Sequence, residues 1–293
     1  MSHLRSLSTW MCLLMALALR ADPVGAQSLL DRFIIRQDLD TKHDVPQPAF
    51  FQVTSPENKP AVISAGIGVI GKIVDNPLVT FGPSFEYLRS TALAKPVDSL
   101  KGGAALEWQT RLVDPSGQGA ADSPVINAKV NYVRDGTKET SGFQALAVYT
   151  HVFVGKRSRF LPNNEHQFHR ELTAIYSPDV GLEFQQDSAS AKSTGGHALR
   201  AVAEVTISVY PSRTALEQKL EVTASISSRS DMVKTFDYAD RQHTLSTAAV
   251  NYYLLKQAKR SAGFGITLTH GEDPGKGFEQ QHVWQFGLRL QFK

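Results

Sequence analysis

Histidines close to carboxylates are the residues of this chain best suited to chemistry, because an acid and an imidazole together can activate water or hold a metal ion. Glu165, His166 and His169 form one such group. Positions 166 and 169 fall on opposite faces of a strand, so the two histidines are poorly placed to share an ion. We therefore expect no metal site there.

Asp237, Asp240 and His243 form a second group, in a polar stretch ahead of an apolar segment. Such a group can activate water, and it supports a hydrolase as one alternative function. His151 lies inside an apolar segment and is interpreted as structural. Because no glycine-rich phosphate loop is found either, we assign no catalytic residue and no cofactor.

Residues 1–26 have the three parts of a secretory signal peptide. Arg5 makes the start positive, residues 10–19 are apolar but too short to span a bilayer, and small residues precede an expected cleavage before Gln27. The alternative is a buried N-terminal helix. Cleavage would remove Cys12, the only cysteine, and would leave a mature chain without disulfides.

The rest of the chain has neither a charge cluster nor a long apolar run. The formal net charge is +3 and is spread along the sequence, which argues against a nucleic-acid partner. No later segment approaches the roughly 20 apolar residues of a membrane-spanning helix.

From about residue 60 onward, segments of roughly ten to fifteen residues alternate apolar and polar side chains, with turn-forming residues between them. This pattern predicts about twelve β-strands, an even number as in single-chain bacterial barrels. Ser177, Pro178 and Asp179 are interpreted as a tight turn between two of them. The expected strands are 63–72, 79–87, 106–112, 126–132, 142–154, 172–176, 180–185, 199–209, 219–226, 243–256, 262–270 and 283–293, and the first could instead lie near 50–54.

The expected connections also sort by length, as in barrels with short turns on one rim and longer loops on the other. Every second connection is short, and the pattern fails only toward the N-terminus. The short connections are near 135–141, 177–179, 211–215 and 257–261, and the longer ones near 114–123, 155–165, 229–242 and 272–280.

Alternation alone suits a soluble β-sandwich as well as a membrane barrel. Charges of both signs at the middle of polar faces, and aromatic residues near strand ends, favour the barrel. The side chains expected to line its interior are Glu107, Arg111, Lys129, Arg200, Glu204, Lys219, Glu221 and Arg289.

The C-terminal segment adds a more specific pattern. Gln285, Gly287, Leu290 and Phe292 have the types and spacing of polar, glycine, hydrophobic and terminal aromatic positions. This pattern resembles the C-terminal insertion signal of bacterial outer-membrane β-barrels, which usually ends on the aromatic residue, whereas here Lys293 follows. The resemblance implies recognition by the barrel-assembly machinery and a place in the outer membrane.

We therefore expect an all-β, antiparallel up-and-down transmembrane β-barrel of about twelve strands. The expected organisation is a signal peptide at 1–26, a periplasmic tail or an interior plug at 27–47, and the barrel at 48–293. Its expected partners are outer-membrane lipid, the assembly machinery and a small solute. The expected function is a narrow passive pore or a structural barrel, and not an enzyme. The alternatives are the hydrolase and a soluble periplasmic β-protein that binds a small ligand.

Overall fold

The computed structural model describes residues 33–36, 49–54, 62–76, 78–91, 96–110, 123–153, 161–211, 216, 219–237, 240–257, 260–273 and 279–292. The predicted signal peptide and Arg111 lie outside these residues. Every regular element in the described part of the chain is a β-strand. In the same residues, no helix combines the length and apolar character needed to cross a bilayer.

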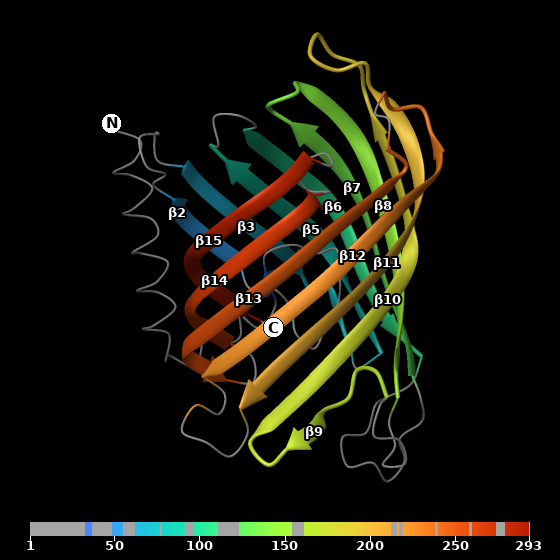
Figure 1. The fold of residues 1–293 in the computed structure, drawn as a ribbon. Coiled ribbons are helices and arrows are strands. Elements are labelled where there is room, and N and C mark those ends of the chain that lie inside the picture. Colours follow the sequence, from blue (N-terminus) through green and yellow to red (C-terminus); the bar gives the residue numbers. More distant parts are fainter. Residues whose placement is uncertain are drawn as a thin grey trace.

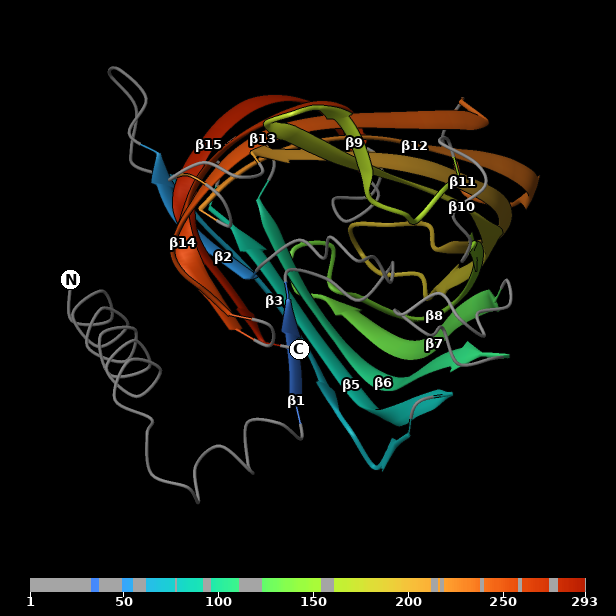
Figure 2. The same cartoon turned by 90° about the horizontal axis from the view of Figure 1, so that it is seen from below.

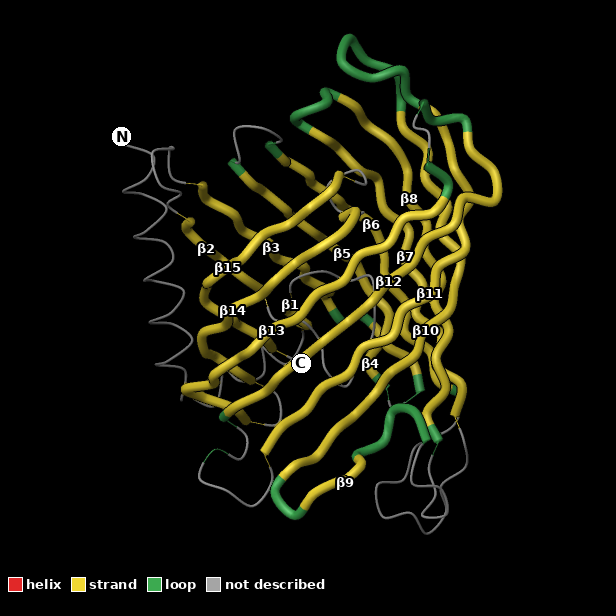
Figure 3. The backbone as a smooth tube through the Cα atoms, viewed as in Figure 1, coloured by secondary structure: helices red, strands yellow, loops and turns green. Residues whose placement is uncertain are grey.

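Strands make up most of the described backbone (Figures 1 and 3). They are β1 (Phe33–Arg36), β2 (Ala49–Thr54), β3 (Val62–Gly71), β4 (Val74–Asp75), β5 (Val79–Ser90), β6 (Val97–Gln109), β7 (Ser123–Asp135), β8 (Thr140–Val152), β9 (His166–His169), β10 (Leu172–Asp187), β11 (Gly196–Pro211), β12 (Leu220–Lys234), β13 (Gln242–Gln257), β14 (Arg260–Asp273) and β15 (Glu279–Phe292).

All described strands belong to one antiparallel sheet, which curves strongly (Figure 2). From β5 to β15, the long strands pair in chain order, with β8 next to β10. At the N-terminal side, β3 pairs with β5 from Ser64 opposite Ser90 to Ile70 opposite Ser84, and it also pairs with β2. β2 in turn pairs with residues 287–290 of β15. The predicted all-β class and up-and-down order are confirmed.

β1 and β2 together take the place of one strand between β3 and β15. β1 pairs with residues 68–71 of β3, and β2 pairs with residues 62–66. β1 also meets β15, where Ile35 lies opposite Phe292. Four residues of the segment predicted to be a tail or plug are therefore part of the sheet, and a strand is present near 50–54 as the sequence suggested.

The turn predicted at Ser177, Pro178 and Asp179 is wrong. β10 is one strand of 16 residues that pairs with β11 along its whole length. Proline is tolerated at position 178 because the ladder on the other side of β10 is interrupted there, between β9 and β8. The carbonyl of Pro178 instead accepts a hydrogen bond from Thr150 Oγ1 at 2.7 Å.

Loss of this turn also overturns the predicted sorting of connections. In an up-and-down sheet, successive connections alternate between the two ends of the strands. The short β13–β14 connection at 258–259 therefore lies at the same end of the strands as the long connections at 110–122 and 153–165. Short turns are therefore not confined to one end of the strands, nor long loops to the other.

The two faces of the strands carry opposite kinds of side chain. Along β11, Arg200, Thr206 and Ser208 are buried, whereas Val205 and Ile207 between them are exposed. β12 alternates in the same way. The buried face is mostly polar and holds a small apolar cluster of Leu146, Val148 and Val202. The core of this sheet is thus polar, and its outer surface is apolar.

Candidate functional site

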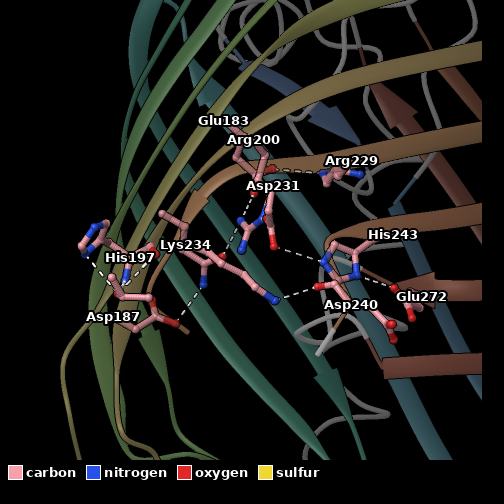
Figure 4. Close-up of polar contacts among 12 residues, drawn as sticks. Glu183, Asp187, His197, Arg200, Arg229, Asp231, Lys234, Asp240, His243 and Glu272 are labelled. Atoms are coloured by element: carbon pink, nitrogen blue, oxygen red, sulfur yellow. Dashed lines mark hydrogen bonds and ion pairs between the residues drawn. The ribbon is translucent and has the colours of Figure 1, made fainter. Parts of the chain in front are cut away.

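The largest described group of charged side chains, most of them buried, spans five neighbouring strands on the inner face (Figure 4). We call it the arginine cluster; it is centred on Arg200 of β11 and also contains Glu183 of β10, Arg229 and Asp231 of β12, His243 of β13 and Glu272 of β14.

Strand register brings these side chains together. Glu183 lies opposite Arg200, and Arg200 lies opposite Asp231. On the next pair of strands, Arg229 lies opposite His243. Directly opposite residues have Cβ atoms about 4.5–5.5 Å apart, close enough for long side chains to pair. The cluster is thus a row that runs across the sheet.

The regular β11–β12 register sets Asp231 opposite Arg200, and a β-bulge follows immediately after Asp231. Leu199 pairs with Val233, but the next residue, Arg200, pairs with Asp231, so Met232 is passed over. An extra residue of this kind changes which side chains point to each face. Asp231 continues the buried alternation of Ser227 and Arg229 and lies opposite Arg200, and beyond it Met232 and Val233 are both exposed.

Arg200 is the centre of the cluster and is 0% exposed. Its Nη1 donates to Glu183 Oε1 at 2.6 Å and to Gln185 Oε1 at 2.9 Å, and its Nε donates to Asp231 Oδ1 at 2.8 Å. Arg229 Nε donates to the other oxygen of Glu183 at 3.1 Å. Burying charges is costly unless they are paired and hydrogen-bonded, and these contacts meet that condition.

His243 of β13 extends the row toward β14. Its Nδ1 is hydrogen-bonded to the carboxylate of Glu272. Its Nε2 lies 3.6 Å from Asp231 Oδ2, which is an electrostatic contact but too long for a hydrogen bond. His243 therefore lies between two acids that are far from it in sequence. The acids that the sequence grouped with it, Asp237 and Asp240, are exposed.

Two further groups of polar contacts lie on the same face, away from the arginine cluster. Lys129 of β7 forms an ion pair with Glu86 of β5 at 2.7 Å, and Lys101 of β6 approaches the same carboxylate at 3.4 Å. Between β12 and β13, Tyr253 donates its hydroxyl hydrogen to Glu221 Oε2 at 2.6 Å. Fixed charges thus occur on well-separated parts of the inner face.

The residues predicted to line an interior occupy different environments. Lys129, Arg200 and Glu221 are buried, Glu107 and Glu204 are half-buried, and Lys219 is exposed in the turn before β12. Arg289 and the four insertion-signal residues lie on β15. The structure pairs Arg200 and Lys129 with acids that the sequence analysis had not selected.

Asp231, Arg229 and Glu272 were missed because the sequence analysis assigned them to connections at 229–242 and 272–280. The structure extends β12 to Lys234 and β14 to Asp273. Glu183 lies in the predicted strand 180–185 between apolar Leu182 and Phe184, and its acidic side chain opposite a basic residue of the next strand was the available signal.

The remaining histidine groups have separate contacts. His166 Nε2 is within 2.6 Å of the Leu161 carbonyl oxygen, and its ring stacks on Tyr176. His169 accepts a hydrogen bond from the backbone of Glu171 at 3.4 Å. Among the described residues, no group of three or more histidine, cysteine or acidic side chains is arranged to hold a metal ion.

The fold and its polar inner face define the class: an all-β protein made of one antiparallel, up-and-down sheet. No protein-family model matches the chain, and no curated protein or solved structure shows significant similarity to it.

Proposed function

We propose that this chain is a transmembrane β-barrel of the bacterial outer membrane that passes small ions or solutes through a narrow polar interior. The observation that carries the proposal is the inverted distribution of side chains. Arg200 and Glu183 are 0% and 1% exposed, whereas Ile207 and Ile226 on the same sheet are 45% and 51% exposed.

An apolar outer face is unfavourable in water and favourable in lipid. Removing a large aliphatic side chain from water contributes about 1.5–3 kcal/mol, and soluble monomers rarely expose apolar patches beyond a few hundred Å². Here exposed apolar residues recur on successive strands, including Val205, Val222 and Val250. A lipid surround removes this cost, and alternation between lipid and lumen is the pattern of membrane barrels.

Strand pairing and strand length support the same proposal. The β3–β5 and β2–β15 pairings would let the sheet close, which satisfies edge backbone groups that lipid cannot. About 9–11 residues of tilted strand cross a bilayer, and β5 through β8 and β10 through β15 have between 12 and 16.

Exposed aromatic residues lie toward both ends of the strands, as the interfacial girdles of a barrel would require. Trp108 and Tyr252 lie toward the end of the sheet at which β6 and β13 finish. Tyr132 and Trp284 lie toward the opposite end. All four are more than two-fifths exposed, with Trp284 at 63%.

The inner face suits a narrow path better than a wide one. The arginine cluster is almost completely buried, so its side chains would form the constriction. Paired charges on the other walls would give permeating ions fixed partners. The resemblance of the C-terminal segment to an insertion signal supports the outer membrane as the destination.

Planar-bilayer recording of the refolded chain tests the pore. We expect a small, steady conductance whose ion selectivity changes in Asp231→Asn, because this change alters the charge of the constriction. Glu139→Gln is the matched control, since Glu139 belongs to an exposed loop ion pair with Lys192. Silence of the folded protein at all voltages would remove the pore and leave a structural barrel. A mature chain that stays soluble without detergent would contradict the barrel itself.

A further inference from the structure

A pair of histidines faces each other on the outer side of the sheet, away from the arginine cluster. His270 of β14 lies directly opposite His282 of β15, and both side chains are exposed. Their Nδ1 atoms are 3.2 Å apart. The two rings meet edge to face, with centroids 5.4 Å apart.

We propose that His270 and His282 form a binding site for a divalent transition-metal ion of the zinc, nickel or copper type. Zn–N bonds are about 2.0–2.1 Å long, so two nitrogens at a tetrahedral angle on one ion stand about 3.3 Å apart. The Nδ1 separation of 3.2 Å matches this spacing without movement of either strand. Imidazole nitrogens are preferred ligands for these ions.

The local backbone keeps this pair separate from the inner face. Gly271 follows His270 with a φ of 114°, a conformation that residues with side chains rarely adopt. Glu272, the next residue, contacts buried His243, whereas His270 is exposed on the outside. The two histidines thus supply two ligands, and water or another oxygen donor from the surroundings would complete the coordination.

The position on the sheet leaves the site accessible. The next cross-strand pair on the same face is Leu268 opposite Trp284, part of the exposed apolar surface. On the other side, the strands run toward their connection at 274–278. The site would therefore lie at the border of the apolar outer surface, where an ion can enter from water. It does not depend on whether the interior conducts.

Zinc competition against a chromophoric chelator tests the site on the full chain, refolded and free of any affinity tag. We expect one Zn²⁺ per chain, bound at least tenfold more weakly by His270→Gln and by His282→Gln. The double variant should bind more weakly still, because it lacks both ligands of the shared ion. His169→Gln is the control, since His169 is exposed on β9. Unchanged affinity in the single variants would overturn the proposal.

A second measurement uses the unaltered protein and so does not depend on how the variants fold. Cu²⁺ added at one equivalent should give an electron paramagnetic resonance spectrum with hyperfine coupling to two imidazole nitrogens, and excess Zn²⁺ should displace the copper. A spectrum of aquo copper, or coupling to one nitrogen only, would contradict a shared site.

Discussion

Arg200 and Asp231 form a buried 2.8 Å ion pair across β11 and β12, at the last regular cross-strand pair before a β-bulge at Met232. The pair joins Glu183 on one side to His243 on the other and so completes a charged row across β10 to β13.

Asp231→Ala should destabilise the folded protein strongly. The substitution leaves Arg200 and Arg229 with one acid in place of two, and an uncompensated buried charge costs about 3–5 kcal/mol. Equilibrium unfolding in detergent or lipid, followed by circular dichroism, measures the loss. Glu139→Gln, which breaks the exposed ion pair with Lys192, should cost no more than about 1 kcal/mol. Equal effects of the two changes would contradict the buried row.

Lys129 and Glu86 should be energetically coupled. Their ion pair is 2.7 Å long and buried, and Lys101 at 3.4 Å from the same carboxylate is the second cation there. In a double-mutant cycle of Lys129→Met and Glu86→Gln, we expect a coupling energy of about 0.5–3 kcal/mol. We also expect Lys129→Met to cost less than Asp231→Ala, since Lys101 still balances Glu86. A coupling energy of zero would show that the contact contributes nothing.

The substitution Ile226→Arg tests whether the outer face contacts lipid or water. Ile226 is 51% exposed near the middle of β12. Arginine at the bilayer midplane of a barrel costs about 2–4 kcal/mol, whereas on a surface in water it is nearly neutral. Unfolding in lipid measures the difference. The control is Ile73→Arg, because Ile73 is 73% exposed just beyond β3, where the cost should be at most about 1 kcal/mol.

Phe292→Ala tests the predicted insertion signal. We expect less protein in the outer membrane of cells, because the assembly machinery would recognise the signal poorly, but normal refolding of the purified chain in detergent. Removal of Lys293 should leave cellular assembly unchanged, since the family pattern usually ends on the aromatic residue. Normal membrane levels of Phe292→Ala would remove the insertion-signal interpretation.

The period-two pattern was sufficient to predict strands and their faces where pairing is regular. In the predicted strand 199–209, alternation puts Val205 and Ile207 on one face and Thr206 and Ser208 on the other, and β11 has the same two faces. Alternation works there because a regular strand turns successive side chains to opposite sides. The same rule placed Glu183 on a polar face.

Local patterns could not reveal features that depend on neighbouring strands. Residues 177–179 have the composition of a turn, but pairing of β10 with β11 at every position holds them extended. The bulge at Met232 leaves two successive side chains, Met232 and Val233, exposed, and this break in the alternation lies in a segment that had been assigned to a connection. The 3.2 Å approach of His270 to His282 depends on the β14–β15 register, which no local segment specifies.

Contact between the apolar outer face and lipid is the central claim, and site-directed spin labelling tests it most directly. A chain starting at Gln27 has no cysteine, so single cysteines at Ile226 and at the adjacent, buried Ser227 can be labelled selectively. In liposomes, we predict that a label at 226 is relaxed by oxygen and protected from a water-soluble nickel chelate, and that a label at 227 is less accessible to oxygen. Strong relaxation by the nickel chelate at 226 would contradict the account.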